Sequence, residues 1–163
     1  MRKHRGLIIV GIVMVALAAY CLWYTHVPRS WADIDGVSQP IHLSKISLSL
    51  YADGDTTGYH ELPGSHPAAQ AVISALENHT YRASLVNLNP IPQDPVRVPG
   101  VDSLSLTMPT PEKLITATIR SNGQLYTDTL SSSPRCHSYQ TDTDLFQEVL
   151  DIFQEYATSE ENK

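Results

Sequence analysis

The sequence predicts an α+β fold, in which an N-terminal transmembrane helix is followed by a two-layer domain with an antiparallel sheet and two helices. Three observations lead to this prediction. Residues 6–24 form an uncharged apolar run, residues 45–140 contain alternating apolar and polar segments with a hairpin signal, and two further segments have apolar residues at helical spacing. A hairpin pairs its strands antiparallel, and both helices need the same sheet to bury their apolar faces.

The N-terminal segment has the length and charge distribution of a membrane anchor. Residues 1–5 contain three fixed positive charges, and the 19 residues from Gly6 to Tyr24 contain no charged residue. A helix of that length extends roughly 28 Å, close to the hydrocarbon thickness of a bilayer. Because basic residues favour the cytoplasmic side, we expect residues 1–5 to be a cytoplasmic tip and 6–24 a single-pass anchor in the cell membrane, with the rest extracytoplasmic.

Two other fates of this segment are signal-peptide cleavage and lipidation. Ala16 and Ala18 have the spacing of a cleavage site, but the apolar run continues for six residues beyond Ala18. Cys21 is the candidate for lipid attachment. The bacterial lipobox has Leu three residues before its cysteine and Gly or Ala directly before it, where this chain has Ala18 and Tyr20. We therefore expect an uncleaved anchor.

The outer part of the chain is acidic. Residues 25–163 contain all 17 acidic residues but only eight of the 11 Lys and Arg residues, so their net charge is about −9. Phosphate groups repel such a surface, and we expect no nucleic-acid partner. The expected partners are the membrane, through residues 6–24, and a protein at the cell surface.

The outer 139 residues suit one domain. Pro28, Gly36 and Pro40 indicate a stalk over residues 25–40, within which Trp31 and Ile34 suggest some packing. Residues 41–163 are expected to form a single extracytoplasmic α+β domain. Cys136 is the one cysteine in this part, so an internal disulfide there is excluded and the fold depends on its hydrophobic core.

In the first half of this domain, the sequence predicts a strand, a helix and a second strand. Ile46, Leu48 and Leu50 alternate with serines, which predicts a half-buried strand ending at an Asp53-Gly54-Asp55 turn. The helix is predicted over residues 65–79, with Pro67 in its first turn. Its apolar stripe is Ala69, Val72, Ile73 and Leu76. Residues 80–88 are predicted to form a second main strand before a Pro-rich loop that reaches residue 100.

In the second half, the sequence predicts a strand, a hairpin, a short strand and a helix. Residues 101–108 alternate, and Asn122-Gly123 favours a two-residue turn within the hairpin over residues 113–130. Such a turn would pair Ile119 with Tyr126 and Ile115 with Leu130. After a short strand at 135–140, residues 141–157 are predicted to be helical, with Glu148 on the solvated face. The apolar stripe of that helix is Phe146, Val149, Leu150, Phe153 and Ala157.

The layout resembles a known kind of bacterial domain. An anchor, a strand, a turn, a helix such as "AVISALEN" (71–78), a hairpin such as "ATIRSNGQLYTD" (117–128) and a final helix follow one another. This order, over roughly residues 45–157, resembles the small membrane-tethered extracytoplasmic domains of unknown function of Gram-positive bacteria. The resemblance implies a location outside the membrane and no established activity, and it transfers no functional residues.

The stretch "DGDTTG" resembles the start of a calcium-binding loop. The oxygen ligands at positions 1, 3 and 5 would come from Asp53, Asp55 and Thr57, with Gly58 at the sharp turn and Glu61 at position 9. However, Gly64 occupies position 12, where such loops need a bidentate glutamate. An ordinary Asp/Gly/Thr turn accounts for the same residues.

His60, Glu61 and His66 are the candidates for a zinc site. A zinc helix needs His-Glu-x-x-His, with both histidines on one helical face. Here Gly64 takes the second histidine's place and Pro63 prevents a regular helix. A site would need His79 or His137 to arrive through tertiary contacts, and these histidines are the basis of an alternative function, a metal-assisted hydrolase.

Known catalytic motifs do not assemble in the sequence. Gly-x-Ser-x-Gly, Ser-x-x-Lys and Cys-x-x-Cys are absent from the chain, and so is a Gly-rich phosphate loop. Cys136 and His137 are adjacent, so in a strand they point to opposite faces and cannot act as a nucleophile and its base. We therefore assign no catalytic, metal or cofactor-binding residue. The expected function is a non-catalytic interaction or sensory module, and a small-ligand-binding protein is a further alternative.

Overall fold

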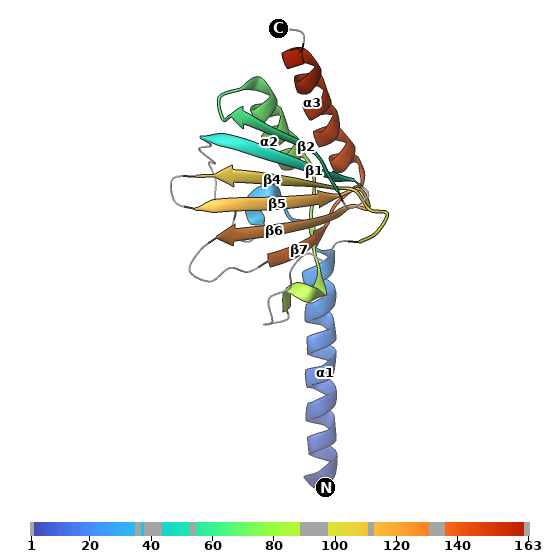
Figure 1. Ribbon diagram of the computed structural model, residues 1–163. Coiled ribbons are helices and arrows are strands. Elements are labelled where there is room, and N and C mark those ends of the chain that lie inside the picture. Colours follow the sequence, from blue (N-terminus) through green and yellow to red (C-terminus); the bar gives the residue numbers. More distant parts are fainter. Residues whose placement is uncertain are drawn as a thin grey trace.

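The computed structural model describes residues 2–34, 37, 44–52, 55–88, 98–110, 113–130 and 136–161 (Figure 1). It is an α+β protein, as the sequence predicts. Its elements are α1 (Arg2–His26), η1 (Trp31–Asp33), β1 (Lys45–Ala52), β2 (Asp55–Pro63), α2 (Pro67–Asn78), β3 (Arg82–Ala83), η2 (Leu85–Leu88), β4 (Ser103–Pro109), β5 (Leu114–Arg120), β6 (Gln124–Leu130), β7 (Cys136–Gln140) and α3 (Asp144–Glu161).

Within the described residues the sheet has seven strands in the order β2-β1-β4-β5-β6-β7-β3, and every neighbouring pair is antiparallel. Alternation along the strands gives the sheet one apolar face. That face is buried in the core through Ile46, Leu48, Leu62, Leu104, Leu106, Met108, Ile115, Ala117, Ile119, Leu125 and Tyr139. Helices α2 and α3 and the turn η1 lie on this side (Figure 1).

The two helices pack against each other as well as on the sheet. The buried residues of α2 are Ala69, Val72, Ala75 and Leu76, and those of α3 are Leu145, Phe146, Val149 and Phe153. Ala75 and Leu145 are buried although they were not in the predicted apolar stripes, whereas Ile73 and Leu150, which were, are only half-buried. A helix that contacts both a sheet and a second helix buries a wider stripe than one contact requires.

One predicted strand is mostly wrong and one strand was missed. Residues 80–88 form only the two-residue strand β3 before the chain turns into η2. Asn87 explains this, because its amide bonds both backbone groups of Ser138 and so replaces the next strand pairs. The missed strand is β2, which pairs along β1 as the edge of the sheet. Gly58 and the polar residues around it obscured its alternation.

The predicted register of the hairpin is also wrong. Ile119 pairs with Leu125, and Leu114, not Ile115, pairs with Leu130. Gly123 donates its backbone N–H to Arg120 O and has a φ of +81°, so the loop has three residues and ends in a left-handed glycine. This loop keeps Ile119 and Leu125 together on the buried face.

The segment that was expected to be a stalk packs into the domain where the structure describes it. Arg29 and Tyr81 exchange two backbone hydrogen bonds of 2.8 and 2.9 Å. Trp31 is fully buried and Ile34 is 2% exposed. Residues 27–34 therefore connect α1 to the core through short, ordered contacts.

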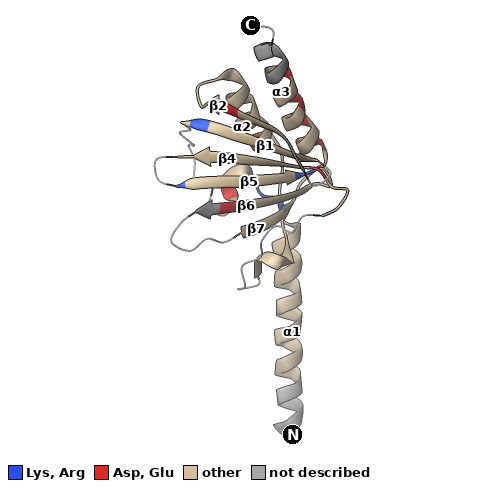
Figure 2. Cartoon of the chain, in the orientation of Figure 1, with Lys and Arg blue, Asp and Glu red and all other residues tan. Residues whose placement is uncertain are grey.

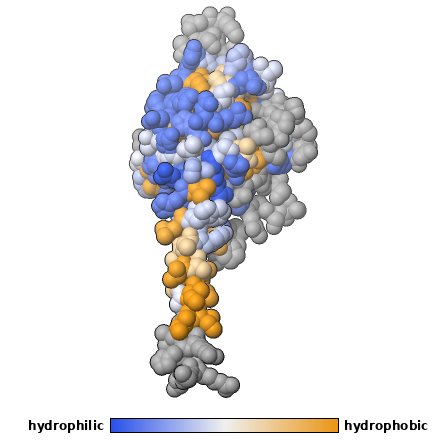
Figure 3. Space-filling view, turned by 180° about the vertical axis from the view of Figure 1, so that it is seen from behind, coloured by the Kyte–Doolittle hydropathy of each residue, from blue (hydrophilic) through white to orange (hydrophobic). Residues whose placement is uncertain are grey.

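Helix α1 projects away from the domain (Figure 1). Of the helices that the structure describes, it alone is long and apolar enough to cross a membrane, over Ile8–His26. Its side chains form an apolar column below a mainly hydrophilic domain surface (Figure 3). Its last turns lie against β3 and η2.

Candidate functional site

The stretch that resembles the start of a calcium-binding loop does not form such a loop in the residues that can be described. Asp53 and Gly54 lie outside the described residues, as do the side chains of Asp55 and Thr57. The backbone from Asp55 onward is the extended strand β2, and Gly58 sits within it opposite Leu50. A calcium loop wraps its ligands around one point, which an extended strand does not do.

Two of the residues weighed as zinc candidates lie on opposite faces of the sheet. His60 is on the core face, whereas Glu61 is on the opposite face and accepts hydrogen bonds from Lys45 Nζ (3.0 Å) and Tyr59 Oη (3.1 Å). The hydrogen bond from Lys45, followed by that from Tyr59, lowers the pKa of Glu61 below its ordinary value. Glu61 is thus held as a carboxylate in a surface ion pair, away from both histidines.

His66 caps the start of α2. Its ring Nδ1 accepts the backbone N–H of Ala68 at 3.1 Å, so the ring proton is on Nε2 and neither nitrogen is free to bind a metal. The ring packs edge-on against Tyr156, 5.0 Å between centroids, and His60 packs against the same tyrosine at 6.4 Å. Among the described residues no group of three or more His, Cys, Asp or Glu could hold a metal ion.

A surface cavity of about 320 Å³ lies between the start of α2 and the end of α3. His66, Ala68, Ala71, Ile152 and Tyr156 are among its lining residues. The small-ligand alternative predicts a pocket between the sheet and the helices, whereas this cavity opens between the two helices.

Cys136 and His137 lie on opposite faces of β7. Cys136 pairs with Asp128 on the face away from the helices, and His137 pairs with Thr127 on the core side. Thr127 is 1% exposed, which identifies that side as the buried one. The thiol and the imidazole are therefore not placed for nucleophilic catalysis with each other.

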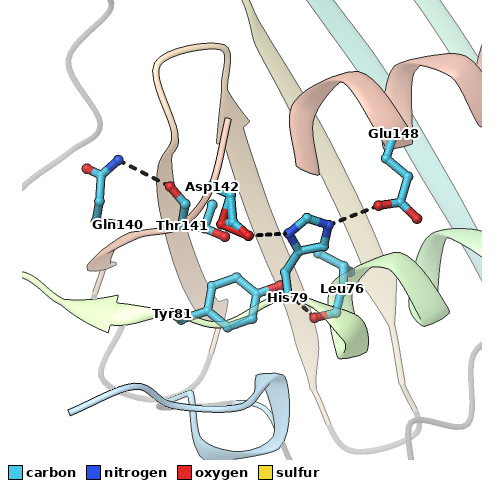
Figure 4. Close-up of polar contacts among 7 residues, drawn as sticks. All are labelled: Leu76, His79, Tyr81, Gln140, Thr141, Asp142 and Glu148. Atoms are coloured by element: carbon cyan, nitrogen blue, oxygen red, sulfur yellow. Dashed lines mark hydrogen bonds and ion pairs between the residues drawn. The ribbon is translucent and has the colours of Figure 1, made fainter. Parts of the chain in front are cut away.

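Figure 4 shows His79 between two acidic side chains, those of Asp142 and Glu148. Its Nδ1 lies 3.2 Å from Asp142 Oδ2 and its Nε2 lies 2.9 Å from Glu148 Oε2. Carboxylates only accept hydrogen bonds, so both contacts are hydrogen bonds only when the ring carries both protons. Each ring nitrogen thus faces a carboxylate, one of them on α3, and we interpret this cluster as a contact that joins the end of α2 to α3.

Tyr81 lies beside His79 and contacts the same end of α2 (Figure 4). Its hydroxyl donates to the carbonyl of Leu76 at 2.6 Å, in the last turn of α2. Burial, and then the negative charges of Asp142 and Glu148, raise the pKa of Tyr81 well above its ordinary value. The phenol is therefore a fixed hydrogen-bond donor and not an acid that titrates near neutral pH.

The face of the sheet away from the helices is rich in hydroxyl groups, and we call it the hydroxyl face. Its residues form two rows of cross-strand neighbours from β2 to β7. The first row is Glu61, Ser47, Thr107, Thr116, Asp128 and Cys136, and the second is Tyr59, Ser49, Ser105, Thr118, Tyr126 and Ser138. Figure 1 shows no described helix over this face.

Within the two rows of the hydroxyl face, the charged residues are Glu61 on β2 and Asp128 on β6, toward the two ends of the first row. The strands are mostly uncharged, and acidic residues gather instead along α3 (Figure 2). Arg120, at the hairpin end of β5, is 5% exposed, and its guanidinium stacks 4.6 Å from the centre of the Tyr126 ring. It also donates to Gln124 Oε1 at 3.0 Å. The centre of the face is thus a neutral surface of short hydroxyl side chains.

Sequence reasoning did not identify the hydroxyl face. The signal was present in "SLSL" at 47–50 and 103–106, where every second residue is serine. Alternation alone shows that each strand has a polar side. That these sides align in rows depends on the strand order and register.

Comparisons with protein-family models, with curated protein sequences and with solved structures each find no significant match.

Proposed function

We propose that this protein is a membrane-anchored, extracytoplasmic interaction module whose hydroxyl face binds a protein partner at the cell surface. The observation that carries the proposal is the asymmetry of the sheet. One face is covered by α2, α3 and η1, while no described helix covers the face with two ordered rows of hydroxyl side chains.

The composition of the hydroxyl face favours a protein partner. Tyrosine supplies contact area at low entropic cost, and short hydroxyl residues supply adaptable hydrogen bonds, which is the combination that antibody binding surfaces use. In the second row, tyrosines at two positions enclose three central hydroxyl residues, Ser49, Ser105 and Thr118. At roughly 4.8 Å per strand, Tyr59 and Tyr126 are about 19 Å apart, a width that fits a peptide segment or a small protein surface.

The anchor supports the proposed location. Helix α1 has the length and apolarity to cross a bilayer. Arg2, Lys3 and Arg5 lie before its apolar part, which favours a cytoplasmic N-terminus. With that orientation the domain after residue 26 is outside the cytoplasm.

The alternatives have weaker support. A metal-assisted hydrolase needs His60, Glu61 and His66 to converge, and the sheet keeps Glu61 on the other side. A small-ligand-binding protein would use the cavity beside Tyr156. That second candidate is retained because the cavity has an aromatic and an imidazole ring in its wall.

Site-specific photocrosslinking tests the choice of surface. Tyr59 on the hydroxyl face is replaced by p-benzoylphenylalanine, and Tyr156 at the α2–α3 cavity is the matched control of the same residue type on the helix side. After irradiation of cells that carry the full chain, we expect a discrete protein adduct from position 59 and none from position 156. Adducts from position 156 alone, or from both positions equally, would contradict binding by the hydroxyl face.

A fractionation experiment tests the anchor separately. The full chain should remain in the membrane pellet after alkaline carbonate treatment, and external protease should degrade the domain in cells without an outer barrier. Release into the supernatant, or protection from protease, would overturn the proposed anchoring or orientation.

A further inference from the structure

In the short turn η2 the apolar side chains face solvent and the polar side chain faces the protein, the opposite of an ordinary surface turn. Leu85, Val86 and Leu88 are 53%, 42% and 42% exposed, whereas the polar residue between them, Asn87, faces the protein. Single exposed aliphatic residues are common on soluble proteins, but three within four residues make a local apolar patch that calls for a partner.

The patch is held in place by specific bonds. Asn87 Nδ2 donates to Ser138 O at 2.8 Å, and the Ser138 N–H donates to Asn87 Oδ1 at 2.7 Å. The backbone N–H of Ser84 also donates to Ser138 O at 2.9 Å. Because η2 is tied to β7 through Ser84, directly before the turn, and through Asn87 within it, the exposure of its leucines and valine is a property of the folded state.

The position of η2 indicates what the patch contacts. It lies beside α1, alongside the last turns of that helix and below the sheet (Figure 1). The aromatic residues of those turns are Tyr20, Trp23 and Tyr24, with Trp23 60% exposed. Tyrosine and tryptophan of a membrane-spanning helix concentrate at the level of the lipid headgroups.

We infer that η2 inserts Leu85, Val86 and Leu88 into the outer leaflet, as a second membrane contact next to α1. This inference rests on the proposed anchoring through α1. The nearby charges agree with it, because Arg29 pairs with Tyr81 and the exposed Arg82 precedes Leu85 by three residues, and lipid phosphates attract such cations. Arg29 lies 4.8 Å above the Tyr24 ring, at the end of the span.

A second contact fixes how the domain stands on the membrane. The strands run across the axis of α1, and the sheet extends from β3, near α1, to β2 at the far edge (Figure 1). With α1 and η2 both in the bilayer, the sheet stands on its β3 edge. The hydroxyl face then looks along the membrane surface, toward other proteins anchored in the same membrane.

Fluorescence quenching in vesicles tests the inference. The full chain with Cys21→Ala and Cys136→Ser receives one cysteine, Val86→Cys in η2 or Ser65→Cys as the control, and each is labelled with a polarity-sensitive dye. Ser65 is exposed after β2, at the edge of the sheet farthest from α1. The vesicles contain equal parts of phosphatidylcholine and phosphatidylglycerol, with nitroxide-labelled lipid added as the quencher.

Unlabelled protein in the same vesicles reports on the anchor, since Trp23 is exposed on α1 whereas Trp31 is fully buried. We expect quenching of Trp23, and blue-shifted, quenched emission from the dye at position 86 but not at position 65. Quenching of Trp23 with position 86 behaving like position 65 would overturn the η2 contact alone. Absence of Trp23 quenching would overturn the anchoring itself and the η2 contact with it.

Discussion

The Nε2 atom of His79 lies 2.9 Å from Oε2 of Glu148, although 69 residues separate them in the chain. His79 is the C-cap of α2 and Glu148 is in α3, so the contact joins the two helices at one end. The His79 side chain is 11% exposed, whereas that of Glu148 is 47% exposed. Glu148 is therefore on the solvated side of α3, as its spacing predicts, and still takes part in tertiary structure.

A double-mutant cycle should detect this contact. Glu148→Ala is expected to lower the free energy of unfolding by about 0.5–1 kcal/mol, in the range of a partly screened ion pair. In a His79→Ala background the same substitution should have almost no further effect, because its partner is gone. Urea unfolding of the full chain in a mild detergent measures both values. Equal effects in the two backgrounds would show that the pair is not formed in solution.

Replacing Gly123 is expected to destabilise the protein in two ways, through its positive φ and through a steric clash of the added Cβ. Gly100, which has only the positive φ, serves as the control that separates the two effects. Gly123 has a φ of +81°, and a Cβ there would lie 2.6 Å from the carbonyl oxygen of Thr141. Gly100 has a φ of +73°, and no atom of the described residues other than its chain neighbours lies within 4 Å of its Cβ position. Gly100→Ala should cost about 1–2 kcal/mol from the backbone alone, and Gly123→Ala about 2–5 kcal/mol because overpacking is added. Similar melting temperatures for the two variants would contradict the close approach.

Phe153→Ala tests the docking of α3. Phe153 is 3% exposed and packs near the His60 ring, so its removal should leave a cavity and cost about 3–5 kcal/mol. Glu155 is exposed on the same helix, and Glu155→Ala is expected to change the stability by less than about 0.5 kcal/mol. If both variants unfold at the same urea concentration, α3 is not packed on the sheet.

Tyr81 should make the protein sensitive to alkali. Burial, and then Asp142 and Glu148, raise the pKa of its phenol in the folded state, whereas in the unfolded chain it ionises at about pH 10. The stability that this shift contributes is therefore fully present below about pH 10 and is lost as the pH rises further. Tyr81→Phe should lower stability at neutral pH by about 1 kcal/mol, through the lost bond to Leu76, but should weaken the alkaline decline.

The control for this prediction is Tyr59→Phe, since Tyr59 is 61% exposed. Unfolding free energies of the wild-type chain and both variants at about pH 8 and about pH 11 give the comparison. An unchanged alkaline decline in Tyr81→Phe would assign that decline to other groups.

Local patterns predicted most of the elements. Strict alternation located β1 and β4, and helical spacing located α2 and α3, because burial on one side imposes a period on each element by itself. The Asn122-Gly123 turn signal located β5 and β6. The prediction was wrong for residues 80–88, where one side chain, Asn87, takes the place of a strand pair. No local sequence pattern indicates that a side-chain amide will take the place of a backbone strand pair.

The sequence by itself determined the α+β class, the apolar N-terminal helix, the acidic charge of the outer part and the left-handed Gly123, since each depends on composition or on neighbouring residues. The tertiary structure alone decided which polar residues come together. It paired residues 55–63 along β1 as the strand that separates His60 from Glu61, joined His79 to Glu148, and aligned the hydroxyl rows. The physical reason is that strand order and register, set by packing over the whole chain, determine the neighbours of each side chain, and one step in register exchanges the faces of a strand.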